Sequence, residues 1–411
     1  MATLPNRVRI GFVGASPARG WFLAAHLPAL KALKDQFEIS AVCTSQAQTA
    51  ALAKDLTGSR WAFDDYNQLV QCEDVDLVVV TVKTRLHDEI VRAAIKAGKN
   101  VLCEWPLGRD VPEAEALADL ADQAGVRHVI GLQARAAPAV VAARRLIREG
   151  YVGRVLSTSI VASGFGWGPF IDPDQVYLFD AKSGSSMLNI TGGHLLDALC
   201  HVCGEFESVG AQIATRRQRI AVVEPAATEP LRRFDALLEP EGARPGALGV
   251  GLVRALSWFA PTSPDQVAVN GLLENGAVAS AHVRGGQHRG TNLLWEINGE
   301  EGELQITGSA GTLQTVELTL RGGRGRTANL EPLPFAEEHQ ASACDAPRGP
   351  AANVWRLYQA YLGLSTPPDV ELADFRAAAG RQRLLTAIEQ SAAEGRTVSG
   401  FGAPRLLQAS R

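Results

Sequence analysis

The sequence has 411 residues, of which 46% are hydrophobic and 20% are charged, and its formal net charge is −4 at pH 7. At roughly 100–200 residues per domain this length predicts two domains, and an apolar, weakly charged chain is expected to fold rather than stay disordered. The absence of a basic excess excludes a nucleic-acid binder that works by pairing many cations with phosphates.

Membrane insertion and secretion are not expected either. The apolar run 247–253 ends at Arg254 and is much shorter than the ~18–20 residues that span a bilayer. No apolar signal core precedes the first strand-like segment, so we expect a cytoplasmic protein. The six cysteines are too few for a disulfide framework in a chain of this length.

Residues 1–133 are predicted to form a Rossmann-type dinucleotide-binding domain of the α/β class. Apolar strand-like runs alternate there with helical segments, as in a doubly wound parallel sheet whose two faces are both covered. The predicted strands are 8–14, 38–45, 76–82, 100–106 and 127–133, and the predicted helices are 21–34, 46–57, 86–98 and 110–124.

Residues 134–411 are predicted to form an α+β domain with a large open, mostly antiparallel sheet. Alternating patterns joined by the hairpin signals 274–276 and 298–302 favour such a sheet. The predicted strands are 154–164, 209–216, 266–285, 292–308 and 312–322, and the predicted helices are 138–153, 190–203, 353–364 and 371–395. We expect the last helix to pack on the first domain. Two irregular segments, 217–265 and 327–352, fit no motif.

The first site is a glycine-bearing turn, 11–21, that follows the first strand and opens a helix. Backbone N–H groups at such a turn bind a pyrophosphate. Gly14 takes the tight-turn position, whereas Ser16 stands where a second glycine is usual and Gly20 comes one residue late. Arg19 either pairs with a phosphate or is solvated, and the alternative for the whole segment is a plain turn. The predicted contacts are Gly14, Ala15, Ser16, Arg19, Gly20 and Trp21.

The end of the second strand bears on the choice of cofactor. An NAD site usually places an acidic residue here to bind the ribose 2′-hydroxyl. This chain has the neutral Thr44 and Ser45 instead, so NADP is slightly favoured over NAD. Alternatively these two residues decide little and both cofactors bind.

Several segments resemble the glucose–fructose oxidoreductase/inositol dehydrogenase (Gfo/Idh/MocA) family. These segments are 9–30, 84–107 and 192–199. One branch of the family, typified by the fungal galactose-gene repressor and bacterial relatives, is resembled more specifically by three features: the spacing from Lys83 to His87, the E-W-P motif and segment 130–153. The resemblance implies a Rossmann domain followed by a domain with a large open sheet. It also implies NAD(P)-dependent oxidation of sugars, polyols or related alcohols, although the repressor branch uses the bound dinucleotide in regulation. Further cofactor contacts are then expected from Val82, Lys83, His87, Glu104, Trp105, Pro106 and Gln133.

The chain departs from this family at two catalytic positions. Hydride transfer from an alcohol needs a base and donors that hold the developing oxyanion, which the family supplies from E-K-P and D-x-G-x-H. Here Trp105 replaces the lysine and Ile190 replaces the aspartate, with Asn189 and Thr191 beside it. Of the family's three catalytic residues only the histidine is retained, as His194.

Three functions are compatible with these departures. In the favoured one, Lys83 polarises the substrate oxygen, His194 carries the proton and Trp105 forms an apolar wall, so that hydride passes between NAD(P) and a hydroxyl of a sugar, polyol or sugar-derived compound. In the second, catalysis is lost and the bound dinucleotide signals to a protein partner. In the third, the protein is a glycosidase that transiently oxidises its sugar with bound NAD.

Each remaining candidate has a structural alternative. His87 is as readily a structural residue that opens a helix, and His194 a satisfied core histidine. The 200–203 segment, C-H-V-C, lacks a second ligand pair, so no metal is expected. An open sheet with an apolar face must be covered, so we expect a homodimer or homotetramer through it. Candidate substrate contacts are Trp105, Arg135, Trp167, Tyr177, Asn189 and Asp197.

Overall fold

The structure, a computed structural model, describes residues 7–164, 166–224, 237–238, 252–253, 255–326, 329–334, 346–364 and 370–402. The chain divides into two compact units. Unit 1 comprises residues 1–145, 314–317 and 334–383, and unit 2 comprises 146–313, 318–333 and 384–411.

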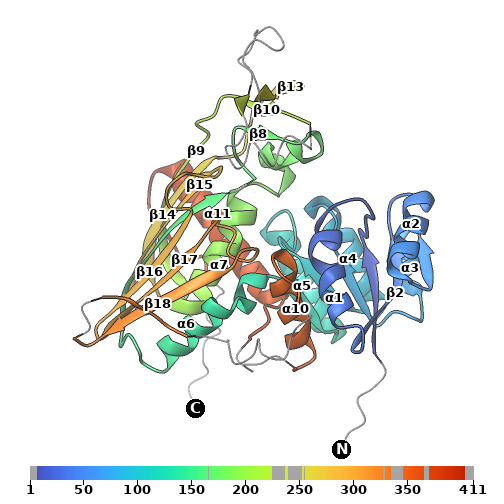
Figure 1. The fold of residues 1–411 in the computed structure, drawn as a ribbon, viewed down its shortest axis with the longest axis horizontal. Helices are drawn as coiled ribbons and strands as arrows, with labels where there is room; N and C mark the ends of the chain where they lie inside the picture. The colour runs from blue at the N-terminus through green and yellow to red at the C-terminus, as the bar shows by residue number, and fades with distance from the viewer. Residues whose placement is uncertain are drawn as a thin grey trace, which may run out of the picture. The chain divides into compact units, whose positions relative to one another are not determined.

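Unit 1 is built on a six-stranded parallel sheet with the order β3-β2-β1-β4-β5-β6 (Figure 1). This is the doubly wound order that binds dinucleotides, and its topological switch point lies between β1 and β4. The predicted fold class is therefore confirmed for this half. The strands are β1 (Val8–Val13), β2 (Phe37–Cys43), β3 (Trp61–Phe63), β4 (Leu77–Val80), β5 (Asn100–Glu104) and β6 (His128–Gly131). The sequence analysis missed β3, because three residues carry no periodic signal.

Local signals account for the helices of unit 1. Asp110 caps α5 through the Glu113 N–H at 3.0 Å, and Asp65 caps α3 through the Asn67 N–H at 2.8 Å. The turn of π-helix η1 (Phe22–His26) and helix α1 (Leu27–Ala32) together replace the single helix expected over 21–34. The other helical elements are α2 (Ala47–Thr57), α3 (Tyr66–Gln71), η2 (Thr84–Leu86), α4 (His87–Lys96), α5 (Val111–Ala124), η3 (Gln133–Ala136) and α6 (Pro138–Arg148).

A helix from the far end of the sequence completes the core of unit 1. Helix α10 (Pro350–Tyr361) packs against η1 and α1. Its buried side chains Val354, Leu357, Tyr358 and Tyr361 belong to the same hydrophobic cluster as residues of β1 and β2. The Rossmann core therefore depends on residues more than 200 positions beyond β6.

Unit 2 contains a nine-stranded sheet with the order β19-β18-β17-β16-β7-β15-β14-β9-β20 (Figure 1). Every neighbouring pair is antiparallel except β7 and β15, so the predicted open, mostly antiparallel sheet is confirmed. Its strands are β7 (Val155–Gly164), β9 (Phe206–Ala214), β14 (Gln266–Leu273), β15 (Val278–Gly285), β16 (Leu293–Gly299), β17 (Gly302–Gly308), β18 (Leu318–Arg324), β19 (Glu331–Pro332) and β20 (Val398–Ser399). Residues 312–317, predicted as strand, precede β18 instead.

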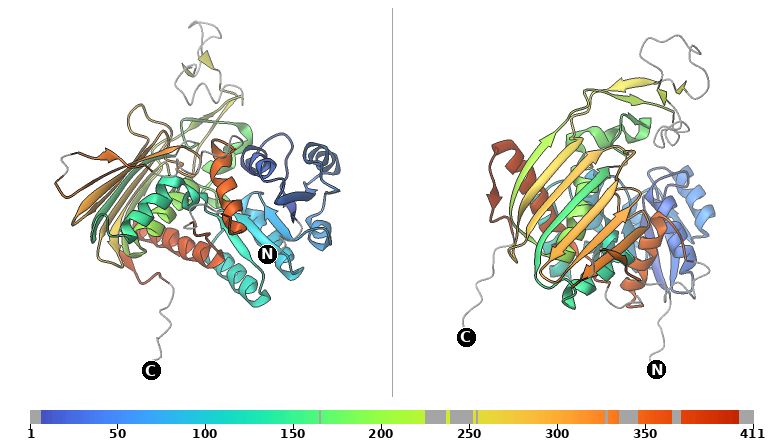
Figure 2. Two further views of the ribbon diagram at one scale, coloured as in Figure 1. Left: turned by 60° about the horizontal axis from the view of Figure 1, so that its bottom comes forward. Right: turned by 60° about the vertical axis from the view of Figure 1, so that its left-hand side comes forward.

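The two faces of this sheet differ. One face packs on helix α7 (Gly193–Cys203) and on the end of α11 (Phe375–Glu394), whose Ser391 hydroxyl accepts from the Ala211 N–H of β9 at 3.0 Å. The other face carries no described helix (Figure 2, right). Register places small and polar side chains across it, with Leu272 and Val278 exposed at one end. Alternation puts the large apolar side chains, such as Trp295 and Ile160, on the covered face, and association through the outer face stays a prediction.

The first irregular segment carries structure at its ends. Strands β8 (Phe170–Ile171), β10 (Ile220–Val222) and β13 (Ser257–Phe259) form a small separate sheet. Two further short strands, β11 (Leu237–Leu238) and β12 (Leu252–Val253), pair in parallel. Much of 217–265 and of 327–352 lies outside the described residues. No helix among the described residues has the length and apolar character of a membrane span.

Candidate functional site

The turn after β1 has the geometry expected of a tight glycine turn. Gly14 has φ +97°, and a Cβ there would lie 2.8 Å from Val82 Cγ1 and 3.0 Å from the Thr81 carbonyl carbon. The N–H groups of Gly14 and Ala15 both donate to the Cys43 carbonyl, at 2.9 and 3.2 Å. The turn is thereby fixed between the carboxyl ends of β2 and β4, at the switch point where ligands bind.

The rest of the turn leaves room for a ligand. Gly20 also has positive φ, +94°, with no atom within 4 Å of where its Cβ would be. Arg19 is exposed and Ser16 is half-buried. Trp21 begins the helical turn, and its buried Nε1 has no hydrogen-bond partner among the described residues. Buried N–H groups are almost always satisfied, so this unpaired donor next in sequence to Gly20 is compatible with a polar ligand at the turn.

The structure brings an acidic residue to the end of β2 that sequence analysis missed. The Thr44 N–H donates to the Phe63 carbonyl at 3.2 Å, which places the exposed Asp64 next to Thr44. The Thr44 hydroxyl is hydrogen-bonded to Thr49 Oγ1 at 2.6 Å and donates to the Gln46 carbonyl at 2.9 Å. Asp64 directly follows the missed strand β3, so a carboxylate also lies at this edge, and the slight preference for NADP stays a prediction.

His87 joins two loops at the carboxyl edge of the sheet. Its Nδ1 lies 2.7 Å from the Pro106 carbonyl and its Nε2 lies 3.0 Å from the Val82 carbonyl. Burial lowers the pKa of His87, although the carbonyl contacts act in the opposite direction. The ring nitrogens are thus engaged within the fold, which agrees with the structural alternative. Lys83, three residues beyond β4, is exposed.

A buried polar cluster surrounds Glu104, the last residue of β5. Gln133 Nε2 donates to both carboxylate oxygens, at 2.9 and 2.7 Å, and His26 Nε2 lies 2.9 Å from Oε1. His26 Nδ1 lies 2.8 Å from the hydroxyl of Tyr358 on α10. We call these four residues the Glu104 cluster. Sequence analysis missed His26 and Tyr358, because no local pattern links residues 332 positions apart.

Gly131 makes room for this carboxylate. A Cβ at Gly131 would lie 2.6 Å from both carboxylate oxygens of Glu104, far inside ordinary contact. The side chain of Glu104 is 13% exposed and that of His26 is 1% exposed. The carboxylate therefore lies below the surface at the carboxyl end of the sheet. Its hydrogen-bond donors come from η3, which carries Gln133, and from η1, which carries His26.

Trp105, at the position of the family lysine, is buried, 5% exposed. It precedes Pro106 through a cis peptide bond. An indole cannot hold or release a proton in the manner of an amine. The structure therefore gives this position no acid–base group.

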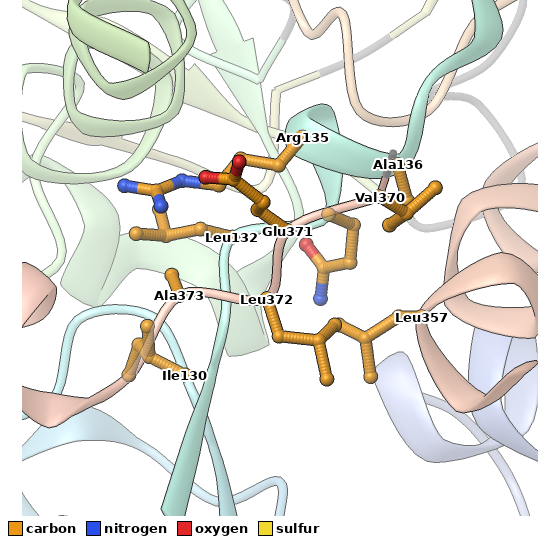
Figure 3. Close-up of a pocket in the computed structure, with 10 residues that line it drawn as sticks. Ile130, Leu132, Arg135, Ala136, Leu357, Val370, Glu371, Leu372 and Ala373 are labelled. Atoms are coloured by element: carbon orange, nitrogen blue, oxygen red, sulfur yellow. The ribbon is translucent and has the colours of Figure 1, made fainter. Parts of the chain in front are cut away.

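A small hollow, partly open to solvent, lies in unit 1 beside the Glu104 cluster (Figure 3). Gln133 and Arg135 contribute to its wall, together with α10. Arg135 and Glu371 lie on the same side of it in Figure 3, and Glu371 pairs with Arg144 at 2.7 Å. Its lining residues are Ile130, Leu132, Gln133, Arg135, Ala136, Leu357, Val370, Glu371, Leu372 and Ala373.

In unit 2, His194 and Asp197 lie on α7, just after the π-helical turn η6 (Leu188–Gly192). His194 is 5% exposed and Asp197 is fully buried. The hydroxyl of Thr191, also fully buried, has no hydrogen-bond partner among the described residues. Asn189 Oδ1 accepts from Ser186 Oγ at 2.5 Å. Ile190, at the family aspartate position, is half-buried, so that position itself carries no carboxylate, and Asp197 is the acidic residue on the same helix as His194.

The other unit 2 candidates lie in packed surroundings. The Trp167 ring is buried and its N–H donates to the Leu178 carbonyl at 3.1 Å, while burial raises the pKa of Tyr177. Their roles toward a substrate stay predictions. Cys200 and Cys203 are buried and form no disulfide in the described part of the chain, and burial raises the pKa of Cys203 to about 12. Within the described ranges, no group of three or more His, Cys, Asp or Glu side chains is arranged to hold a metal.

Comparison with family models matches both halves of the chain. Residues 8–132 match the oxidoreductase family with an NAD-binding Rossmann fold. Residues 138–234 and 255–308 match the C-terminal domain of Gal80p.

Individual relatives include regulators and dehydrogenases. The galactose/lactose metabolism regulatory protein GAL80 of Kluyveromyces lactis is 29% identical over 78% of this chain and 68% of its own length. Dehydrogenase aclE of Aspergillus oryzae is 36% identical over 51% of this chain and 58% of its own length. Levoglucosan dehydrogenase of Pseudarthrobacter phenanthrenivorans is 27% identical over 64% of this chain and 63% of its own length.

Solved structures share the fold at low sequence identity. A super-repressor mutant of Gal80p from Saccharomyces cerevisiae superposes with a TM-score of 0.81 at 22% identity, covering 96% of this chain and 98% of that one. The two-part architecture is therefore shared with Gal80p.

Proposed function

The chain belongs to the Gfo/Idh/MocA oxidoreductase family, with a C-terminal domain of the Gal80p type, and from this premise we propose that it is an NAD(P)-dependent oxidoreductase. The proposed reaction transfers a hydride between the nicotinamide and a hydroxyl or carbonyl of a sugar, polyol or sugar-derived compound. The bound nicotinamide supplies or accepts the hydride; the protein has to bind, orient and exchange a proton.

The turn at Gly14 is the main observation that supports the proposed binding of a dinucleotide. Its positive φ and its approach to Val82 leave no room for a side chain, and it lies at the switch point of a 3-2-1-4-5-6 sheet. The unpaired Trp21 Nε1 at the adjoining helix start adds a donor. A backbone cradle at this place is the physical requirement for a pyrophosphate site.

For the chemistry we propose Lys83 and His194. Lys83 is the cation that follows β4 at the carboxyl edge of unit 1, suited to polarise a substrate oxygen. His194, near the start of α7 in unit 2, is suited to accept the hydroxyl proton because a histidine titrates near neutral pH. Trp105, Arg135, Trp167, Tyr177, Asn189 and Asp197 are the proposed substrate contacts.

The choice between NAD and NADP is open to a direct measurement. Thr44 and Ser45 favour NADP, as neutral donors near a 2′-phosphate. Asp64 opposes it, because a carboxylate accepts from the 2′-hydroxyl of NAD and repels a phosphate. Titration with all four dinucleotides, followed by calorimetry or by NAD(P)H fluorescence, gives the preference.

The activity is tested with a panel of sugars and polyols, following absorbance at 340 nm. Lys83→Ala and His194→Ala are each expected to lower the rate by about 10²-fold or more while the dinucleotide still binds. If both variants keep full activity, these two assignments are wrong. Release of sugar from a glycoside without net NADH formation would instead indicate the glycosidase.

A second function, dinucleotide-dependent regulation of a protein partner, is favoured by one observation. The catalytic lysine position holds a buried tryptophan and the aspartate position an isoleucine, and relatives over most of the chain are regulatory proteins. In this case the dinucleotide binds without turnover, and the capture of a protein partner depends on it.

The proposal also covers the oligomeric state of the protein and its location in the cell. We propose a cytoplasmic homodimer or homotetramer that pairs through the outer face of the nine-stranded sheet. On that face the register places Ser159 and Ser280 beside the partly exposed Val161 and Leu294, a mixed polar and apolar surface that a second copy of the sheet would cover. A monomer in light scattering would contradict this.

A further inference from the structure

The Glu104 cluster contains a carboxylate that has no role in the proposed proton transfer or in the glycine turn. The Glu104 carboxylate accepts three close contacts from two nitrogen atoms, those of Gln133 and His26. Hydrogen bonds from N–H groups stabilise the ionised form of a carboxylate. Burial keeps water and counter-ions from screening the charge.

Tyr358 determines which ring nitrogen of His26 donates to Glu104. Burial, with Glu104 nearby, raises the pKa of Tyr358 well above its ordinary value, so its hydroxyl keeps its proton. When the Tyr358 hydroxyl donates to His26 Nδ1, the ring hydrogen of His26 is on Nε2, which faces Glu104 Oε1 at 2.9 Å. The chain from Tyr358 to His26 to Glu104 therefore directs an N–H at the carboxylate.

The topology places this charge in the nicotinamide half of the sheet. In a 3-2-1-4-5-6 sheet the pyrophosphate lies at the first turn, and the ribose contact after β2 marks the adenosine half. The other half is formed by β4, β5 and β6, and Glu104 is the last residue of β5, at the carboxyl edge. The oxidised nicotinamide ring carries a positive charge, which the reduced ring lacks.

We propose that Glu104 is a fixed negative charge that makes this site bind oxidised dinucleotide more tightly than reduced dinucleotide, with His26 and Tyr358 as positioning residues. This inference rests on the proposed function, because it needs a bound nicotinamide. This redox preference serves the oxidation of an alcohol, because the site holds the oxidised dinucleotide that accepts the hydride and releases the reduced dinucleotide more readily. The inference is independent of Lys83 and His194.

The test measures the ratio R of the dissociation constant of NADH to that of NAD⁺, by fluorescence and calorimetry, on the full-length protein. Two unit charges about 10 Å apart, at an effective dielectric constant of about 20, shift an equilibrium by roughly tenfold. Glu104→Gln is therefore expected to lower R by about tenfold, which equals about 1.4 kcal/mol or about 30 mV for a two-electron couple. A merely structural role would weaken both forms equally and leave R unchanged.

Two further variants complete the design. Tyr358→Phe is expected to lower R by less than Glu104→Gln does, because the carboxylate remains but loses its ordered donor. Glu38→Gln is the control for loss of a carboxylate elsewhere on the sheet. Glu38 lies at the opposite, amino end of β2, where its partly exposed side chain pairs with Arg7 at 2.8 Å, and R is expected to stay within twofold of the wild type.

The outcomes separate the inference from its premise. If wild-type protein binds both redox forms and R is unchanged in Glu104→Gln and Tyr358→Phe, the inference fails and the proposed function stands. If wild-type protein binds no NAD(P) in either form, the proposed function fails and the inference with it. If Glu104→Gln does not fold, Tyr358→Phe decides, and an unchanged R then overturns the inference. The same measurement with NADP⁺ and NADPH applies if that pair binds more tightly.

Discussion

Gly131→Ala tests whether the space over Gly131 is what allows the Glu104 carboxylate to be buried. The new Cβ would lie 2.6 Å from both carboxylate oxygens, whereas non-bonded carbon contacts lie near ~3.5 Å. The carboxylate then has to move by roughly 0.5–1 Å, which breaks or lengthens its bonds to Gln133 and His26.

The magnitude follows from those bonds. A hydrogen bond to a charged group contributes about 1.5–3 kcal/mol, and a buried group left unsatisfied costs about 1–3 kcal/mol. Losing one or two such bonds predicts that Gly131→Ala lowers the free energy of unfolding by about 2–4 kcal/mol. Gly166→Ala is the control, because nothing lies within 4 Å of its added Cβ and surface changes stay within about 0.5 kcal/mol.

The assay is urea unfolding of the full-length protein in a double-mutant cycle with Glu104→Ala. Removing the carboxylate removes the clash, so Gly131→Ala is expected to cost less than about 1 kcal/mol in that background and the coupling energy to exceed about 1 kcal/mol. Additivity within about 0.5 kcal/mol would refute the reasoning, since the two sites would then not share a contact.

Three further predictions concern binding and pH. Gly14→Ala is expected to weaken dinucleotide binding by at least about tenfold, through strain of about 1–3 kcal/mol at positive φ and the contact with Val82; unchanged affinity in calorimetry would contradict the cradle. Asp64→Asn is expected to raise the affinity for NADP⁺ relative to NAD⁺, and an unchanged ratio would remove Asp64 from the site. The hydrogen bond from Arg9 to Asp76 holds the pKa of that carboxyl below its ordinary value, so its contribution is present above the unfolded pKa of about 3.9 and is lost as pH falls through the lower folded pKa. Arg9→Ala should therefore reduce the loss of stability between pH 7 and pH 3, measured by thermal unfolding; an unchanged pH dependence would contradict this.

The local sequence was sufficient for elements with strong periodic patterns. Continuous apolar runs identified β1, β4 and β5, and the alternation of β14 and β15 identified the antiparallel sheet, because burial on two faces or one leaves a direct pattern in the residues. Gly14 was identifiable for the same reason: a turn that requires positive φ selects glycine. The short strand β3 left no such pattern, and Asp64 was missed with it.

What the sequence by itself determined is the alternation of the longer strands and helices, two halves of different sheet type, and a glycine turn suited to a dinucleotide. Only the tertiary structure decided which distant polar groups meet. Tyr358 reaches His26 because α10 packs on η1 and α1, and Glu104 stays under the surface because Gly131 leaves it room. Such contacts join strands and helices that are adjacent in space but remote in the chain, and local propensity carries no record of them.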